Sequence, residues 1–363
     1  MGISVRTGVL IFTTILCLFT LILFFIPARY SNTDLSNAVQ YYLSGTGNRN
    51  LLLGVRPLLI FLATLSPLPI PVTLSIISGI FYVFLIPTGF FLVKMLYGDR
   101  AAYCFPLLWL PNAYLMLNAF APNADVPAIF AGLLIMWTTL KIISQKRSDY
   151  MSIVSVIPLG LLGGLLGLIR ENVLTAVFGA FLLILFSDRL KGVIYLSIAL
   201  SLPAIWQVYA HTAYGVSILT QISTGISLAI EYEYNPMKIA RYFLYGVGPL
   251  TLFSLLLGLL YDYNRNRQKI IHCFLIPAVA LALGWPAIFE PRLALIAFHA
   301  LIPPASYGFS ILTNSLANHV FYGKRAGALI IVTIYSLNLL FNVWMSYVNN
   351  KNSFSPIWRF LQP

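Results

Sequence analysis

The feature that most restricts the fold of this chain is a series of long apolar segments separated by short polar ones. Most of these segments run for about 18–25 residues, the length of an α-helix that crosses a bilayer. Of the 363 residues, 59% are hydrophobic and only 9% are charged, whereas a soluble domain carries about a quarter charged residues. The sequence therefore predicts an all-α, polytopic membrane protein with a single integral membrane domain over residues 1–363.

About eleven membrane spans are expected from the apolar segments. They are residues 8–27, 72–96, 102–119, 125–143, 152–169, 172–187, 191–210, 242–261, 270–287, 292–312 and 326–347. Residues 57–66 are apolar but too short to cross a bilayer, so we expect them to form an interfacial or re-entrant helix. Two long loops are expected on one side of the membrane: residues 28–56, which include an amphipathic stretch, and residues 211–241.

The distribution of Lys and Arg sets the expected orientation. With the N-terminus in the cytoplasm, thirteen of the 22 Lys and Arg residues fall on the cytoplasmic side, which is the side that basic residues favour. An odd number of spans then places the C-terminus and both long loops outside the plasma membrane. The basic residues occur singly or in pairs, so the net charge of +12 does not predict nucleic-acid binding.

A charged pair, Arg170-Glu171, interrupts the apolar run from residue 152 to residue 187. As one helix this run would be about 54 Å long, nearly twice the hydrocarbon thickness of about 30 Å. We therefore expect a helical hairpin with its turn at residues 169–172, on the outer side and at the depth of lipid phosphates. Neighbouring helical residues point about 100° apart, so Arg170 and Glu171 are expected to face different partners. The simpler interpretation of Arg170 is a plain turn charge.

Other charged residues lie on the same expected side, in the first long loop or at helix ends: Asp34, Arg56, Asp125, Glu290 and Arg292. Each has a simpler interpretation as well. Arg56 fits a headgroup anchor, and Asp34 and Asp125 fit charges at helix N-termini. Glu290 and Arg292 fit a surface ion pair.

In this order, these residues resemble motifs of the GT-C class of integral-membrane glycosyltransferases. They are most similar to the prokaryotic branch related to protein O-mannosyltransferases and the lipid A aminoarabinose transferase. The matching stretches are Asp34 with "AVQYYLSG", Arg56-Pro57, "ADVP" at 124–127, "GLIRE" at 167–171 and "EPRL" at 290–293. The sequence departs from the family pattern at Leu35, where many relatives have a second acid, and at Leu293, where they have an aromatic residue. No soluble domain is expected after the last span.

The resemblance implies a transferase that moves a hexosyl or pentosyl group from a polyprenyl-phosphate donor, with inversion. The acceptor would be a hydroxyl of a lipid, glycan or protein outside the membrane. The implied roles are Asp34 as general base, Arg170 and Arg292 as ligands of the donor phosphate, and Glu171, Asp125, Glu290 and Arg56 as residues that orient these groups or bind the sugar. No cofactor is assigned and no residue is assigned to a metal, although the use of a divalent metal stays open.

Two other classes of protein fit parts of the sequence. A transporter or lipid-linked-sugar flippase would use proline-broken segments such as "PLPIPV" as discontinuous helices around a midplane site. Against this, no charged residue lies near the middle of any expected span. The third alternative is a non-catalytic subunit of a membrane assembly.

Overall fold

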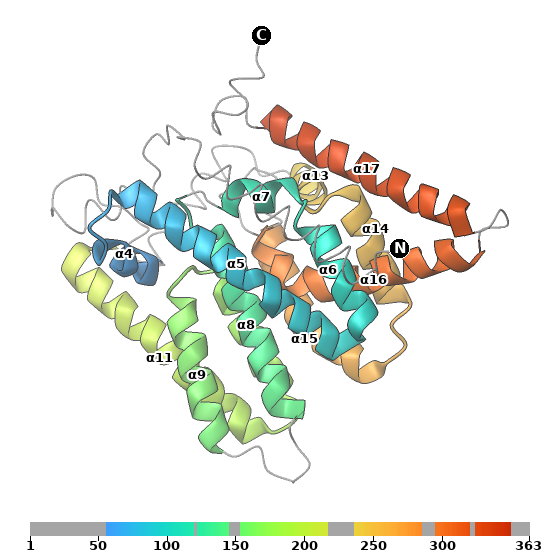
Figure 1. The fold of residues 1–363 in the computed structure, drawn as a ribbon. Coiled ribbons are helices and arrows are strands. Elements are labelled where there is room, and N and C mark those ends of the chain that lie inside the picture. The colour runs from blue at the N-terminus through green and yellow to red at the C-terminus, as the bar shows by residue number, and fades with distance from the viewer. Residues whose placement is uncertain are drawn as a thin grey trace.

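The computed structural model describes residues 56–119, 122–144, 153–216, 236–284, 295–319 and 324–349. Its helices are α4 (Pro57–Thr64), α5 (Ile70–Tyr97), α6 (Asp99–Trp109), α7 (Ala113–Ala119), α8 (Asp125–Ser144), α9 (Ile153–Gly167), α10 (Val173–Leu185), α11 (Arg189–Tyr214), α13 (Pro236–Val247), α14 (Pro249–Leu260), α15 (Arg265–Gly284), α16 (Phe298–His319) and α17 (Lys324–Asn349). No strand occurs within these ranges (Figure 1). The predicted all-α class is confirmed.

Four helical segments in the described ranges are long and apolar enough to cross a bilayer. They are Val72–Tyr97, Asp125–Ser144, Arg189–Tyr214 and Leu295–Leu316. Other apolar helices are shorter, among them Ile153–Gly167 and Pro249–Leu260. Length and composition therefore support an integral membrane protein, without fixing the predicted number of spans. The expected first span, residues 8–27, and most of the first long loop lie outside the described residues.

The predicted helical hairpin is confirmed. Helices α9 and α10 are joined by a turn at residues 168–172, and each arm is only 15 or 13 residues long. At 1.5 Å per residue, the arms are about 22 Å and about 20 Å long. The predicted short helix at residues 57–66 is also present as α4, which is separate from α5.

Two of the expected single spans are wrong, because each is broken into two helices. The segment 102–119 divides at residues 110–112, where Pro111 has no amide hydrogen to continue the helix. The segment 242–261 divides at Gly248, which has a φ of 86° and precedes Pro249, the first residue of α14. The expected loop 211–241 is also helical at both ends, in α11 and α13.

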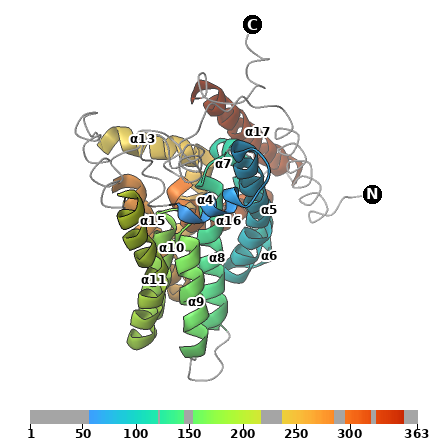
Figure 2. The same cartoon turned by 90° about the vertical axis from the view of Figure 1, so that its left-hand side faces the viewer.

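The two breaks are joined by one side chain, that of Asn112. Its Oδ1 atom accepts hydrogen bonds from the backbone N–H groups of Tyr114 and Leu115, both at 3.1 Å, and so caps α7. Its Nδ2 atom donates to the carbonyl oxygens of Gly246 and Val247, at 3.0 and 3.3 Å. The side chain therefore ties the start of α7 to the end of α13, which runs across one end of the bundle at a steep angle to α9 and α11 (Figure 2).

Helix α16 lies at the centre of the bundle and contacts α5, α6, α8, α14, α15 and α17. Its closest approach is to α14, where Gly258 faces Gly308. A Cβ atom on Gly258 would overlap the carbonyl oxygen of Pro304, and one on Gly308 would overlap that of Ser254. Small residues allow helix backbones to come this close inside a membrane.

A larger residue at position 308 is expected to force α14 and α16 apart. Gly308→Leu should destabilise the protein by about 1–3 kcal/mol or more. The new side chain would overlap backbone atoms of α14, which cannot move aside as the end of a flexible side chain could. The control is Ser315→Ala, an exposed position on the same helix. Thermal unfolding in detergent measures both, and equal melting temperatures for the two variants would contradict the close crossing.

Candidate functional site

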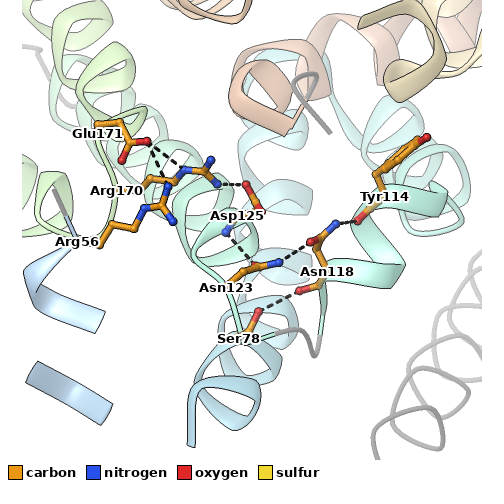
Figure 3. Close-up of polar contacts among 8 residues, drawn as sticks. All are labelled: Arg56, Ser78, Tyr114, Asn118, Asn123, Asp125, Arg170 and Glu171. Atoms are coloured by element: carbon orange, nitrogen blue, oxygen red, sulfur yellow. Dashed lines mark hydrogen bonds and ion pairs between the residues drawn. The ribbon is translucent and has the colours of Figure 1, made fainter. Parts of the chain in front are cut away.

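Four of the predicted site residues come together in the structure, and we call Arg56, Asp125, Arg170 and Glu171 the charge cluster (Figure 3). Three separate parts of the chain supply them. Arg56 precedes α4, Asp125 is the first residue of α8, and Arg170 and Glu171 lie in the turn between α9 and α10. The other predicted site residues, Asp34, Glu290 and Arg292, lie outside the described residues.

Opposite charges alternate through the cluster. The Arg170 guanidinium forms an ion pair with Asp125 through Nη1 and Oδ1. The Nη2 atom of Arg56 donates a hydrogen bond to Oε1 of Glu171 at 3.4 Å. Each residue of the Arg170-Glu171 pair thus has a different partner. The two also form an ion pair with each other, with Nε of Arg170 3.6 Å from Oε1 of Glu171. The expectation that they face different partners is therefore met only in part.

The cluster is buried and its formal charges cancel. Asp125 is 3% exposed and Arg170 is 5% exposed, while the side chains of Glu171 and Arg56 are 9% and 14% exposed. An unpaired charge at such a site would cost several kcal/mol. Two guanidinium groups facing two carboxylates avoid that penalty, so all four groups can stay charged.

The two guanidinium groups control the protonation of Glu171. Burial acts to raise the pKa of this carboxyl, but the charges of Arg56 and Arg170 outweigh burial and hold the pKa below its ordinary value. Glu171 is therefore a carboxylate at neutral pH. Its Oε2 atom has no hydrogen-bond partner within the described part of the chain.

Backbone contacts bring the cluster together. The N–H of Leu58, in the first turn of α4, donates to the carbonyl oxygen of Leu168 at 3.1 Å. This bond fixes the start of α4 against the hairpin turn and so places Arg56 beside Glu171. Asp125 enters from the other side as the acidic first residue of α8, a position that the helix dipole favours.

The sequence interpretation missed a row of polar contacts that leads to Asp125. The backbone N–H of Asp125 donates to Oδ1 of Asn123 at 3.1 Å, and Nδ2 of Asn123 donates to Oδ1 of Asn118. Asn118 is held in turn by Tyr114 and Ser78 (Figure 3). A signal was present, since an Asn two residues before an acidic helix start is typical of an Asx-turn.

The described residues give no indication of a metal site. No group of three or more His, Cys, Asp and Glu side chains within the described ranges is arranged to hold an ion. The charge cluster supplies two carboxylates, but each is already paired with a guanidinium.

Comparison with known proteins gives a result only at the level of structure. No protein-family model and no curated protein matches the sequence. The oligosaccharyltransferase of Archaeoglobus fulgidus in its apo form is similar, with a TM-score of 0.61 and 13% identity over 96% of this chain. ArnT from Cupriavidus metallidurans in the apo state is similar too, with a TM-score of 0.58 and 10% identity over 94% of this chain.

The chain has the fold of GT-C membrane glycosyltransferases. The resemblance predicted from the motifs is confirmed at that level. A structure of the same ArnT bound to undecaprenyl phosphate also matches, with a TM-score of 0.57 and 11% identity. The chain spans only 56% of the length of the oligosaccharyltransferase and 74% of the length of apo ArnT.

Removing one member of the central ion pair is expected to destabilise the GT-C-like bundle strongly. Arg170→Ala leaves Asp125 buried without its cation, and losing one partner of a buried pair costs about 3–5 kcal/mol. Lys94→Ala is the control, because Lys94 and Asp99 form a pair with side chains 50% and 51% exposed, which contributes about 0–1 kcal/mol. Thermal unfolding in detergent tests this prediction. Similar losses of stability in the Arg170→Ala and Lys94→Ala variants would show that the Arg170–Asp125 pair is not buried in the working protein.

Proposed function

We propose that this chain is a glycosyltransferase that moves a sugar from a polyprenyl-phosphate donor to an acceptor hydroxyl outside the membrane. The observation that carries the proposal is the buried charge cluster at the hairpin turn of a GT-C-like bundle. The ArnT structure bound to undecaprenyl phosphate supports a lipid phosphate as part of the donor. The acceptor is a lipid, glycan or protein, and the transferred group is a hexosyl or pentosyl unit.

The reaction needs a base and a cation. An acceptor hydroxyl is a poor nucleophile, so a carboxylate within hydrogen-bond reach takes its proton as it attacks. We assign that role to Asp34. A single displacement inverts the anomeric carbon and leaves a phosphate with an additional negative charge. Fixed guanidinium groups stabilise that charge as it develops, and we assign them to Arg170 and Arg292.

The geometry refines the role of Arg170. Its guanidinium is held between two carboxylates, those of Asp125 and Glu171, so a donor phosphate that reaches it has to compete with Asp125. The two carboxylates thus hold the Arg170 guanidinium in one position before a donor phosphate binds. Asp125, Glu171, Arg56 and Glu290 serve to orient the cations or to bind sugar hydroxyls.

The transporter alternative is not favoured, because the similar solved structures are those of glycosyltransferases. The segment "PLPIPV" at residues 67–72 covers part of the break between α4 and α5 and does not interrupt α5 itself. Helix α5 begins at Ile70 and continues to Tyr97, with Pro71 in its first turn, a position where proline is tolerated.

Orientation is part of the proposal, and labelling tests it. We expect the end of α11 to lie outside and the segment between α14 and α15 to lie in the cytoplasm. Cysteines introduced at Thr212 and Asn264, both exposed in the structure, should react differently with an impermeant reagent in intact cells. We expect labelling of the Thr212→Cys variant alone. Labelling of the Asn264→Cys variant alone would show that the protein has the opposite orientation in the membrane.

The role of Asp34 as base has a direct test. Asp34→Asn keeps the shape and a capping oxygen but cannot take a proton, so sugar transfer should fall by about 10²–10⁴-fold. Binding of the lipid donor should stay within a few-fold. The assay is transfer from radiolabelled lipid-linked sugar to a cell-envelope fraction.

The matched control is Asp188→Asn, since Asp188 caps α11 by accepting a hydrogen bond from the Lys191 N–H and Asn caps equally well. Full transfer by the Asp34→Asn variant would remove Asp34 from the mechanism. A flippase would show no transfer in any form, including the unchanged protein.

A further inference from the structure

A row of side-chain amides leads from α7 to the charge cluster. Nδ2 of Asn118 donates to the carbonyl oxygen of Tyr114 at 2.6 Å, and Oδ1 of Asn118 accepts from Nδ2 of Asn123. Oδ1 of Asn123 then accepts from the backbone N–H of Asp125 at 3.1 Å. Beyond this point the row passes through the Asp125 carboxylate to Arg170 (Figure 3). We call Asn118 and Asn123 the amide relay.

The relay has only one favourable orientation. If the amide of Asn123 turned over, its NH₂ group would face the N–H of Asp125 and its oxygen would face Oδ1 of Asn118. Both contacts would be repulsive, because an amide NH₂ only donates and a carbonyl oxygen only accepts. Each amide therefore fixes the orientation of the next, and such rows are more rigid than separate pairs.

The far end of the relay is anchored to the helix bundle. Asn118 is 4% exposed, and its backbone carbonyl oxygen accepts a hydrogen bond from Oγ of Ser78 in α5 at 3.1 Å. The relay thus extends from two packed helices, α5 and α7, to the first residue of α8. An arginine side chain has several rotatable bonds, so a carboxylate can fix it only if the backbone that carries the carboxylate is itself fixed.

We propose that Asn118 and Asn123 are positioning residues for Arg170. They fix the start of α8, so that Asp125 holds the Arg170 guanidinium where the donor phosphate arrives. This inference rests on the proposed function, because it assumes that a lipid phosphate binds at the charge cluster. The proposed role requires no contact between either amide and the donor.

Two variants interrupt the relay in different ways. In Asn123→Ser, the shorter hydroxyl can still accept from the Asp125 N–H, as in an ST-turn, but it cannot reach Asn118. In Asn118→Leu, a side chain of similar size lacks the amide. The control is Thr139→Val, which removes a buried side-chain hydrogen bond to the carbonyl oxygen of Ile135 within α8 and leaves both amides and all their contacts in place.

Donor affinity is the first measurement. The probe is undecaprenyl phosphate, titrated into purified protein in lipid nanodiscs. Asn123→Ser and Asn118→Leu should each raise the dissociation constant by about 3- to 10-fold, as expected when one hydrogen bond no longer supports the site. Thr139→Val should bind as the unchanged protein does, although it loses a buried hydrogen bond of α8.

Thermal unfolding is the second measurement, and it does not depend on the donor. Arg170→Met is made in the unchanged protein and in the Asn123→Ser variant. If the relay holds Asp125 against Arg170, loss of Arg170 should lower the melting temperature less where the relay is already interrupted.

The outcomes separate the inference from the proposed function. Weaker donor binding in both relay variants, together with non-additive unfolding, supports the positioning role. Unchanged donor binding in Asn123→Ser, or additive unfolding, overturns it while leaving the glycosyltransferase proposal intact. No binding of undecaprenyl phosphate by the unchanged protein overturns donor positioning and the lipid-phosphate part of the proposed function together.

Discussion

The buried ion pair between Arg170 and Asp125 is the contact on which the arrangement around the hairpin turn depends. Neither residue can be buried alone, because an unpaired charge at 5% or 3% exposure would cost several kcal/mol. The α9–α10 turn and the start of α8 therefore have to come together before the Arg170 and Asp125 side chains lose contact with water. Glu171 extends the same requirement to Arg56. One alternating set of charges thus fixes the relative positions of α4, α8 and the hairpin.

The hairpin was predictable from the sequence because it follows from length. An apolar run of that size exceeds the thickness of a bilayer as one helix, and its only charges mark the turn. The breaks at residues 110–112 and at Gly248 were not predicted, since hydropathy over a long window does not respond to single residues. The signals were nevertheless local, in Pro111 and in Gly248-Pro249. Helix termini thus depend on backbone chemistry, whereas spans depend on apolar length.

The gathering of charged residues was also predictable, but their pairing was not. Charges are confined to the ends of membrane helices, so Asp125, Arg170 and Glu171 were expected on one side. Which carboxylate meets which guanidinium depends on packing between distant segments, and Arg56 and Glu171 are 115 positions apart. The amides of Asn118 and Asn123 were not predicted, because uncharged residues are not confined to helix ends as charges are. Only Asn123 has a local sequence signal, its position two residues before Asp125. Their importance appears only when the direction of each hydrogen bond is known.

Charge balance determines what else the proposed donor site needs. The charge cluster holds two guanidinium groups and two carboxylates, so it is neutral before any ligand arrives. A donor phosphate adds negative charge to this low-dielectric region, where it needs compensation. Proton uptake by Glu171 is disfavoured, because Arg56 and Arg170 hold the pKa of its carboxyl below the ordinary value. The compensating charge then has to come from a further cation. We propose that Arg292 is this cation and gives the site its net attraction for phosphate, whereas Arg170 orients the phosphate through a guanidinium that Asp125 and Glu171 already hold in place.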